Sequence, residues 1–456
     1  MTIIPNRCLA LAALTALAGC TTTAPAGDSR LSAVAPPPVP APVVVGADAG
    51  PPTVPDALTL ADAVRLALAH NPTLDAAAWN YEAGAARVLQ AGRLPNPQLG
   101  FTVEDVAGTG NRAGGQEAET TLRLLQLFEL GGKRSARQDE ASRGAELTAW
   151  DYEAARLDLR AATTRAFLDV LAAQERLALA GQSIALAESM VAGIARLVDA
   201  GRESSAEATR AEVTLATVEI DRAQTQRDLD TARQRLAALW GAPPRFSRAA
   251  GRLDEGEPVP PLAALESCLA QNPDLARWDA EFAQRQAAVA LAEANAIPNL
   301  TLEGGLRRYE DTDDTGFVFG AVIPLPLLDR NQGAIAEART QLSRAYAQRS
   351  ATATIARTEL AATYGRLTTA RAEASALRQR VLPAATRAFE IMQAGYDEGR
   401  YRSLDVLDAQ RMLIAARERL LRAVIDGRQA ETAIERIIGG PLEPPTDASS
   451  AGVPTP

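Results

Sequence analysis

Apolar residues recur along this chain with two different spacings, which predict long helices separated by pairs of short strands. The helical spacing is four and three residues, as in a coiled-coil seam, at Leu157, Ala161, Thr164, Leu168 and Leu171. It indicates two long helical runs, Lys133 to about Val198 and Gly333 to about Gln393, the second bent at Pro383. A run of about 65 residues would span roughly 100 Å. Shorter helices, about 203–240 and 401–438, return after each run.

Four shorter segments alternate apolar with polar residues, the pattern of strands that have one apolar face. In the first segment, Leu99, Phe101 and Val103 occupy alternate positions. Each segment has about nine residues, which suits a strand of an outer-membrane barrel. The predicted strands are Gln98–Val106, Thr120–Phe128, Asn299–Arg307 and Gly316–Ile323.

The order of elements occurs twice, because landmarks of the first half return in the second. Leu68–Leu74 returns as Leu269–Leu275 after 201 residues (272 − 71), and Gly201 returns as Gly399 after 198 (399 − 201). Such conserved register indicates a tandem duplication, and the Asn-Pro of each opening helix predicts a break there. The predicted division is a signal peptide at 1–19, a tether at 20–56, copies at 57–241 and 260–440, a linker at 242–259 and a disordered tail at 441–456.

The N-terminus has the features of a targeting segment. Arg7 provides a positive charge, an apolar run follows, and Leu17-Ala18-Gly19-Cys20 resembles a bacterial lipoprotein cleavage box, which implies lipid modification of Cys20. The alternative is an ordinary signal peptide with an incidental cysteine. The Pro- and Ala-rich residues up to 56 then form an extended tether. Cys268 would be the one remaining cysteine besides Cys20, so no internal disulfide is expected.

Composition and charge argue against several classes of function. The net charge is −9 and aromatic residues make up 4% of the chain, so no basic stripe is available for nucleic acid. The single histidine, His70, precedes an Asn-Pro pair, and no Gly-x-Ser-x-Gly or phosphate-binding loop occurs. We therefore expect no enzyme activity, no cofactor and no metal site built from histidine or cysteine. The acidic run Glu310–Asp314 is expected to be a solvated loop.

The strands raise a closure problem that suggests a conduit. No apolar stretch of 18 or more residues follows the signal region, which predicts that no helix spans a membrane. Four strands cannot close a barrel of eight or more, and open sheet edges are not tolerated in lipid. Several chains would therefore each contribute four strands to one barrel, from which the helices project. The alternative is a soluble coiled-coil protein with two β-hairpins.

A turn between two helices, Tyr396–Gln410, carries a candidate site. Gly399 can adopt left-handed backbone angles, and Ser403 is placed to cap the following helix. Asp405 and Asp408 are three residues apart, so both carboxylates lie on one face of the first helical turn.

These motifs together resemble the TolC-type outer membrane factors over about residues 57–440. The resemblance rests on the paired copies, Pro95-Asn96-Pro97, Glu129-Leu130-Gly131-Gly132-Lys133-Arg134 and Tyr396–Gln410. Within the family, the run from Glu129 and the lipoprotein-like start most resemble the cobalt–zinc–cadmium efflux branch. The resemblance implies a mainly α fold with a small β part: a homotrimer with a twelve-stranded barrel in the outer membrane and an α-helical tunnel in the periplasm. It also implies two partners, a periplasmic adaptor and an inner-membrane RND pump.

The resemblance carries particular residues over. Tyr396, Asp405 and Asp408 match the tyrosine and the two lumen-facing acids of the family's periplasmic gate, where three chains would place six carboxylates. The first copy has Glu207 and Arg210 at the equivalent positions. Tyr401 and Arg402 stand where relatives can place an arginine and a small residue. The tips expected to meet the adaptor are Gly201, Arg202, Gly399 and Arg400.

The function expected from the resemblance is a passive exit duct of a tripartite pump that exports heavy-metal cations. Two alternatives remain: a multidrug efflux lipoprotein of the same fold, and a periplasmic coiled-coil adaptor protein. An adaptor would need β-rich segments around a single helical hairpin, and the duplicated pattern argues against it.

Overall fold

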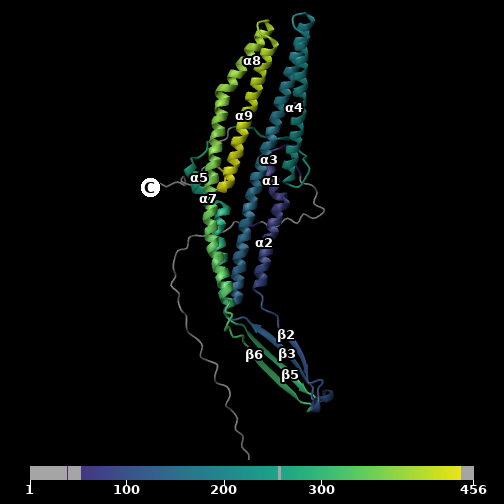
Figure 1. The fold of residues 1–456 in the computed structure, drawn as a ribbon, viewed down its shortest axis with the longest axis vertical. Coiled ribbons are helices and arrows are strands. Elements are labelled where there is room, and N and C mark those ends of the chain that lie inside the picture. Colours follow the sequence, from purple (N-terminus) through teal and green to yellow (C-terminus); the bar gives the residue numbers. More distant parts are fainter. Residues whose placement is uncertain (1–37, 40–52, 255–257, 443–456) are drawn as a thin grey trace, which may run out of the picture. The chain divides into compact units, whose positions relative to one another are not determined.

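The structure is a computed structural model that describes residues 38–39, 53–254 and 258–442. The predicted signal peptide, Cys20, most of the tether and most of the tail lie outside these residues. Figure 1 shows long helices joined to one small sheet. The first half contains α1 Leu60–His70, α2 Pro72–Ala91, β2 Gln98–Glu104, β3 Glu119–Phe128, α3 Lys133–Asp199 and α4 Ser205–Ala238. The second contains α5 Leu262–Cys268, α6 Pro273–Asn295, β5 Leu300–Tyr309, β6 Thr315–Val322, α7 Gln332–Ala376, α8 Leu382–Asp397 and α9 Ser403–Ile438.

The Asn-Pro pairs end one helix and begin the next, which confirms the predicted breaks. Asn71 accepts hydrogen bonds from the backbone N–H groups of Thr73 and Leu74 (2.9 and 3.0 Å), so it caps α2. Its amide also donates to the carbonyl of Leu239 at the end of α4 (2.8 Å). This hydrogen bond joins the start of α2 to the end of α4, the returning helix of the same half.

Asn272 repeats this arrangement in the second half. Its side-chain oxygen accepts from the N–H of Asp274 (2.7 Å), and its amide donates to the carbonyls of Arg436 and Ile437 (2.9 and 2.7 Å). Ile437 follows Leu239 by 198 residues (437 − 239), the same offset as the glycine turns. Both asparagines are buried, so these bonds are shielded from water.

The start and end of the first half also meet through a two-stranded parallel sheet. Here β1 (Ala57–Leu58) pairs with β4 (Arg248–Ala249). Gln174 of α3 holds β4 through both of its side-chain groups, since its oxygen accepts from the Ala249 N–H (2.7 Å) and its amide donates to the Ala249 carbonyl (3.1 Å). Leu58 is fully buried in a core with Phe167, Val170 and Trp240.

The main sheet is antiparallel, with the strand order β2-β3-β5-β6. The two halves meet at β3 and β5, which pair over ten residues from Glu119↔Tyr309 to Phe128↔Leu300. β2 and β6 are therefore the edges of this sheet. The four strands occur at the positions predicted from the alternation of apolar residues.

The run Glu129-Leu130-Gly131-Gly132-Lys133 forms the connection between β3 and α3. The Glu129 carboxylate pairs with Arg137 (2.6 Å), whose guanidinium also donates to the carbonyl of Ala91 (3.0 Å). The arginine's hydrogen bonds hold the pKa of Glu129 below its ordinary range. Lys133 is buried and donates to Asn299 of the second half (2.5 Å). These polar contacts fix the direction in which α3 leaves the sheet.

The second long helical run is interrupted before its proline. A π-helical turn at Leu377–Val381 separates α7 from α8, and Pro383 is the second residue of α8. Proline has no N–H to donate to the preceding turn, and a π turn accommodates that loss by shifting the hydrogen-bond pattern. The predicted place of the interruption is confirmed.

One helix bears on the prediction that no helix spans a membrane. Among the described residues, α3 is long and apolar enough to do so by length and composition alone, with a mean hydropathy of 1.5 in its most apolar 18 residues. Of that stretch, 22% is buried within the chain.

Candidate functional site

The turns that join α3 to α4 and α8 to α9 have the same hydrogen bonds. In the first turn, the N–H of Gly201 donates to Val198 (2.9 Å) and that of Arg202 to Leu197 (2.8 Å). In the second turn, Gly399 donates to Tyr396 (2.8 Å) and Arg400 to Gly395 (2.7 Å). Both glycines have positive φ, 71° and 76°. Each helix therefore ends in a glycine-dependent motif that satisfies its last carbonyls.

The two turns also lie close to one another. A Cβ added to Gly399 would lie 3.5 Å from the guanidinium of Arg202. The four residues that the sequence predicts as adaptor-contact tips, Gly201, Arg202, Gly399 and Arg400, are all exposed. Figure 1 shows both turns at the ends of the helices farthest from the sheet.

Asp405 caps the first turn of α9, where the sequence predicted Ser403. Arg402 is the N-cap residue, and its backbone N–H donates to Asp405 Oδ2 (3.1 Å). Ser403 is already inside the helix and is buried, so the capping prediction for it is wrong. The cap differs from the prediction because an acidic residue at the third helical position, here Asp405, can accept a hydrogen bond from the backbone N–H of the residue before the helix. Hydrogen bonding from the Arg402 backbone, assisted by its guanidinium, lowers the pKa of Asp405.

Asp408 lies one helical turn farther along and is more exposed. Its nearest cation is Arg411, 3.6 Å away, with both side chains more than half exposed. Exposed pairs of this kind are worth about 0–1 kcal/mol, so Asp408 exchanges readily between Arg411 and solvent. The first half has a tighter pair at the equivalent positions, Glu207 and Arg210 at 2.8 Å.

Tyr396 belongs to a small apolar core behind this acidic face. Its ring packs against a cluster that includes Met190, Ile194, Val406 and Leu407, which are buried. The structure thus brings Tyr396 and Asp405 onto neighbouring turns of the same region. Tyr396 packs against the apolar cluster, Asp405 is half-buried, and Asp408 is exposed.

A contact that the sequence did not predict lies in the same turn. A Cβ at Gly395 would come within 2.2 Å of the Tyr401 ring. Gly395 also accepts backbone hydrogen bonds from Arg400 and Tyr401 (2.7 and 3.3 Å). The ring of Tyr401 therefore lies directly on the helix backbone. The sequence feature that could have predicted this contact is Gly395 itself, which lies six residues before the aromatic residue Tyr401, across a tight turn.

A groove of about 670 Å³ opens between α3, α4 and α9 close to these turns. Its lining combines apolar and polar groups, including Val213, Thr217, Leu407 and Arg411. Within the described ranges no three histidine, cysteine or acidic residues lie close enough to hold a metal ion. The site can thus offer charge and shape along a path.

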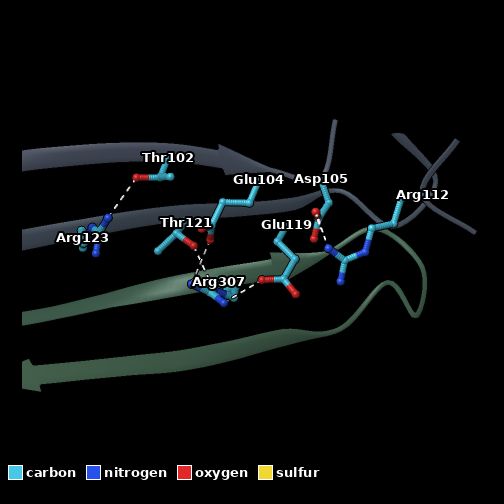
Figure 2. A network of polar contacts seen from close by, with 8 residues as sticks. All are labelled: Thr102, Glu104, Asp105, Arg112, Glu119, Thr121, Arg123 and Arg307. Atoms are coloured by element: carbon cyan, nitrogen blue, oxygen red, sulfur yellow. Dashed lines mark hydrogen bonds and ion pairs between the residues drawn. The ribbon is translucent and has the colours of Figure 1, made fainter. Parts of the chain in front are cut away.

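The sheet has one polar face, and Figure 2 shows the network on it. Arg307 of β5 donates to Glu119 (2.6 Å) and Thr121 (3.0 Å) of β3, and it pairs with Glu104 of β2 (3.3 Å). Arg123 of β3 donates to Thr102 of β2 (3.1 Å) and pairs with Glu303 of β5 (3.5 Å). The network links strands of both halves.

The other face of the sheet is apolar and exposed. The strand register places two rows of such residues side by side: Leu99, Leu124, Gly304 and Phe319, and then Phe101, Leu122, Leu306 and Phe317. Leu99, Phe101, Phe317 and Phe319 are between 68% and 81% exposed. A soluble sheet buries its apolar face. The reverse arrangement is that of a membrane barrel, with apolar residues outward and polar residues inward.

Such a sheet, joined to long helices, defines an outer-membrane channel fold, and comparison with known proteins identifies the family. The family described as outer membrane efflux protein matches residues 63–242 and again 264–440. The chain belongs to this family. The family and its solved members are channel proteins rather than enzymes.

Several curated relatives are metal-resistance proteins. The chain is 37% identical over 383 residues to the cobalt-zinc-cadmium resistance protein CzcC of Cupriavidus metallidurans, covering 84% of this chain and 90% of that protein. It is 27% identical to the nickel-cobalt-cadmium resistance protein NccC of Alcaligenes xylosoxydans xylosoxydans over 62% of this chain and 64% of that one.

Solved structures share the fold at low sequence identity. A crystal structure of CusC matches with a TM-score of 0.72 and 20% identity, covering 84% of this chain and 92% of that one. The outer membrane protein VceC of Vibrio cholerae matches with a TM-score of 0.68 and 20% identity, covering 84% and 97%. The predicted resemblance and the mainly α fold with a small β part are confirmed.

Proposed function

We propose that three copies of this chain form the outer-membrane exit duct of a tripartite efflux pump that exports divalent heavy-metal cations. The observation that carries the metal assignment is the 37% identity to CzcC over 84% of the chain. The protein would act passively, and the inner-membrane RND pump would supply the energy and select the cargo.

The sheet supports a trimer because it is incomplete by itself. β2 and β6 are edges of the main sheet, and within the described ranges no other strand covers them. An open edge is not tolerated in lipid, whereas pairing β6 of one copy with β2 of the next in three copies gives a closed barrel of twelve strands. Among the described helices, α4 packs mainly against α3. Its residues Val213 and Ile220 are exposed, as expected of a surface that a second copy would cover.

The tandem division into copies at 57–241 and 260–440 is part of this proposal. Its support is the repeated order of helices and strands and the identical hydrogen bonds of the two turns. In the trimer the six helical hairpins would alternate around a tunnel. The exposed tips and the groove between α3, α4 and α9 offer the periplasmic adaptor a surface to dock on.

Asp405 and Asp408 would then line the narrowest part of the tunnel. Six carboxylates around one constriction attract cations and repel anions. Their arginine neighbours, Arg402 and Arg411, reduce this effect, but both arginines are exposed and paired loosely. The ring is therefore expected to be moderately cation-selective.

Conductance of the purified channel in planar bilayers tests the ring. Asp405→Ala with Asp408→Ala should lower the ratio of cation to anion permeability, and Arg411→Ala should raise it. The matched control is Glu207→Ala with Arg210→Ala, which alters the equivalent positions of the first copy without changing the net charge. Unchanged selectivity in the double aspartate variant would exclude these residues from the constriction.

Growth of the host tests the cargo. Deletion of the gene should sensitise cells to zinc, cobalt and cadmium, and the wild-type gene should restore resistance. A deletion strain that becomes sensitive to antibiotics alone would refute metal export and favour a multidrug duct. The second candidate is kept because a relative is named for a different cargo: the chain is 27% identical to the pyoverdine export outer membrane protein OpmQ of Pseudomonas putida, over 83% of this chain.

Lipid modification of Cys20 is the remaining part of the proposal. It rests on the sequence Leu17-Ala18-Gly19-Cys20. Mass spectrometry of the mature N-terminus tests it, since Cys20→Ala should abolish acylation and signal processing at that residue.

A further inference from the structure

The connections between strands and helices carry an exposed apolar collar. Each of the four connections at the helix-side end of the sheet contributes to it. Its three members in the connection after β6, Leu325, Leu327 and Leu328, are the most exposed, at 73% to 91% of their surface. The collar consists of Leu94, Leu130, Ile297, Leu325, Leu327 and Leu328.

The segment after β6 continues the apolar face of its strand. Phe317 and Phe319 in β6 are followed at every second position by Ala321, Ile323, Leu325 and Leu327, all exposed. Between them, Pro324 and Pro326 provide no N–H for pairing with a further strand. The apolar surface thus extends beyond the point where the strand pairing ends.

The backbone of this segment is held in place by its own hydrogen bonds. The Leu325 carbonyl accepts from the Leu327 N–H (2.9 Å), the Pro326 carbonyl from the Arg330 side chain (3.2 Å), and the Leu328 carbonyl from Gln332 (3.2 Å). The leucine side chains are therefore exposed on a fixed loop. The bonds to the carbonyls of Leu325, Pro326 and Leu328 also lower the cost of placing this part of the loop against lipid.

Exposed arginines accompany the collar. Arg93 precedes Leu94, Arg134 follows Leu130 after a short interval, and Arg330 follows Leu328. Arginine side chains at a membrane surface place their apolar stems along lipid and their charge at the phosphate level. The combination of exposed leucines with adjacent arginines is the chemistry of a phospholipid headgroup layer.

The length of the strands also places the collar at the level of the phospholipid headgroups. The longest strands, β3 and β5, each have ten residues, which rise about 33 Å along the strand and, at a tilt near 45°, about 23 Å across a membrane. That height is close to the apolar band of about 25 Å in outer-membrane barrels. The connections at the ends of the strands then coincide with the boundary between hydrocarbon and headgroups.

We propose that the collar lies in the headgroup layer of the periplasm-facing leaflet and anchors the base of the barrel to phospholipid. The inference rests on the proposed membrane-inserted barrel. A second copy of the chain is the other occupant to consider. It would add its strands at β2 and β6, whereas Leu130 and Ile297 lie in the connections of the central strands β3 and β5, away from those edges.

Site-directed fluorescence in lipid nanodiscs tests the proposal on the full-length trimer. In a Cys268→Ser background, single cysteines replace Leu328 in the collar, Phe319 in the strand and Ile355 on α7, and each is labelled with an environment-sensitive fluorophore. The parent without a new cysteine gives the background. Ile355 is the matched control, because it is an equally apolar, exposed residue far along a helix from the sheet.

Brominated phospholipids then report the depth of each label. The label at Leu328→Cys should show blue-shifted emission and strong quenching by bromines near the headgroup, and that at Phe319→Cys should be quenched by bromines deep in the chain. The label at Ile355→Cys should be unaffected.

Other outcomes separate the two proposals. A water-like or unquenched label at Leu328→Cys, with Phe319→Cys quenched, overturns the anchor and leaves the barrel standing; a blue shift without quenching would mean that protein covers the loop. Quenching of Leu328→Cys by deep bromines alone would also refute the headgroup placement. No quenching at either position would overturn the inserted barrel itself.

Discussion

Gly131 at the junction of sheet and helices offers a sharp test of the packing. Its φ is +71°, and a Cβ at this position would lie 2.5 Å from Cδ1 and 2.8 Å from Cβ of Ile297. Gly131→Ala therefore meets two independent obstacles. The backbone angle is unfavourable for any residue with a side chain, and the space is already occupied by the second half of the chain.

The two costs can be separated with the neighbouring glycine. The left-handed angle costs about 1–2 kcal/mol, and overpacking against Ile297 costs about 1–3 kcal/mol. Gly132 has the same φ, +71°, but its nearest atom would be Ser135 Oγ at 3.4 Å, an ordinary contact. We expect Gly132→Ala to cost only the first amount, and Gly131→Ala roughly 2–5 kcal/mol.

Denaturant midpoints of the purified channel, followed by helical circular dichroism, measure the difference. Ile297→Ala added to Gly131→Ala should recover most of the extra loss, because it removes the atoms that the new methyl group meets. Ile297→Ala alone should be mild, since the side chain is 43% exposed. Equal midpoints for Gly131→Ala and Gly132→Ala, or no recovery in the double variant, would refute the contact.

Three further predictions concern the helix ends. Asn272→Ala removes a buried cap and leaves two carbonyls without partners, so it should destabilise the fold by about 2–4 kcal/mol and speed hydrogen exchange at the end of α9; Asn272→Asp should keep the cap and lose only the amide bonds. Gly395→Ala should displace the Tyr401 ring and raise the open probability in planar bilayers, and adding Tyr401→Ala should cause no further change; a silent Gly395→Ala would contradict the contact. Because its bonds to Arg402 depress the pKa of Asp405, the cap is complete above the ordinary carboxyl pKa and is lost only as pH falls through the lowered value. The conductance difference between wild type and Asp405→Asn should thus persist below about pH 4, where an ordinary aspartate is roughly half protonated, and its loss already at about pH 4 would show that the carboxylate is not stabilised.

The periodic and punctuating features of the sequence predicted most of the fold. The Asn-Pro pairs fixed the breaks because proline constrains both its own backbone and that of the preceding residue. The alternation at Leu99, Phe101 and Val103 predicted a strand, and it also foreshadowed the inverted sheet, with its apolar face outward. These patterns depend only on residues that are close together in the sequence, so they can be recognised without knowing which segments pack against them.

The errors and omissions involve choices between neighbouring residues or contacts across the chain. Ser403 was predicted as the cap of α9 because serine favours that position. In the structure, Asp405 accepts the capping hydrogen bond from inside the helix. The contact between Gly395 and Tyr401, and the pairing of Arg307 with Glu104, depend on register that spacing alone does not reveal.

The asparagines that fasten each opening helix to its returning helix have a consequence for how the chain can be cut and rejoined. Because Asn71 meets Leu239, and Asn272 meets Ile437, the beginning and end of each copy lie together. A polypeptide severed after β4, within the predicted linker at 242–259, therefore leaves two fragments, each with its own ends tied. We expect the fragments, produced together, to reassemble through β3 and β5, and a circularly permuted gene that starts at the second copy to yield the same channel. An ancestral protein with one copy per chain would need only to associate as six subunits to build this channel.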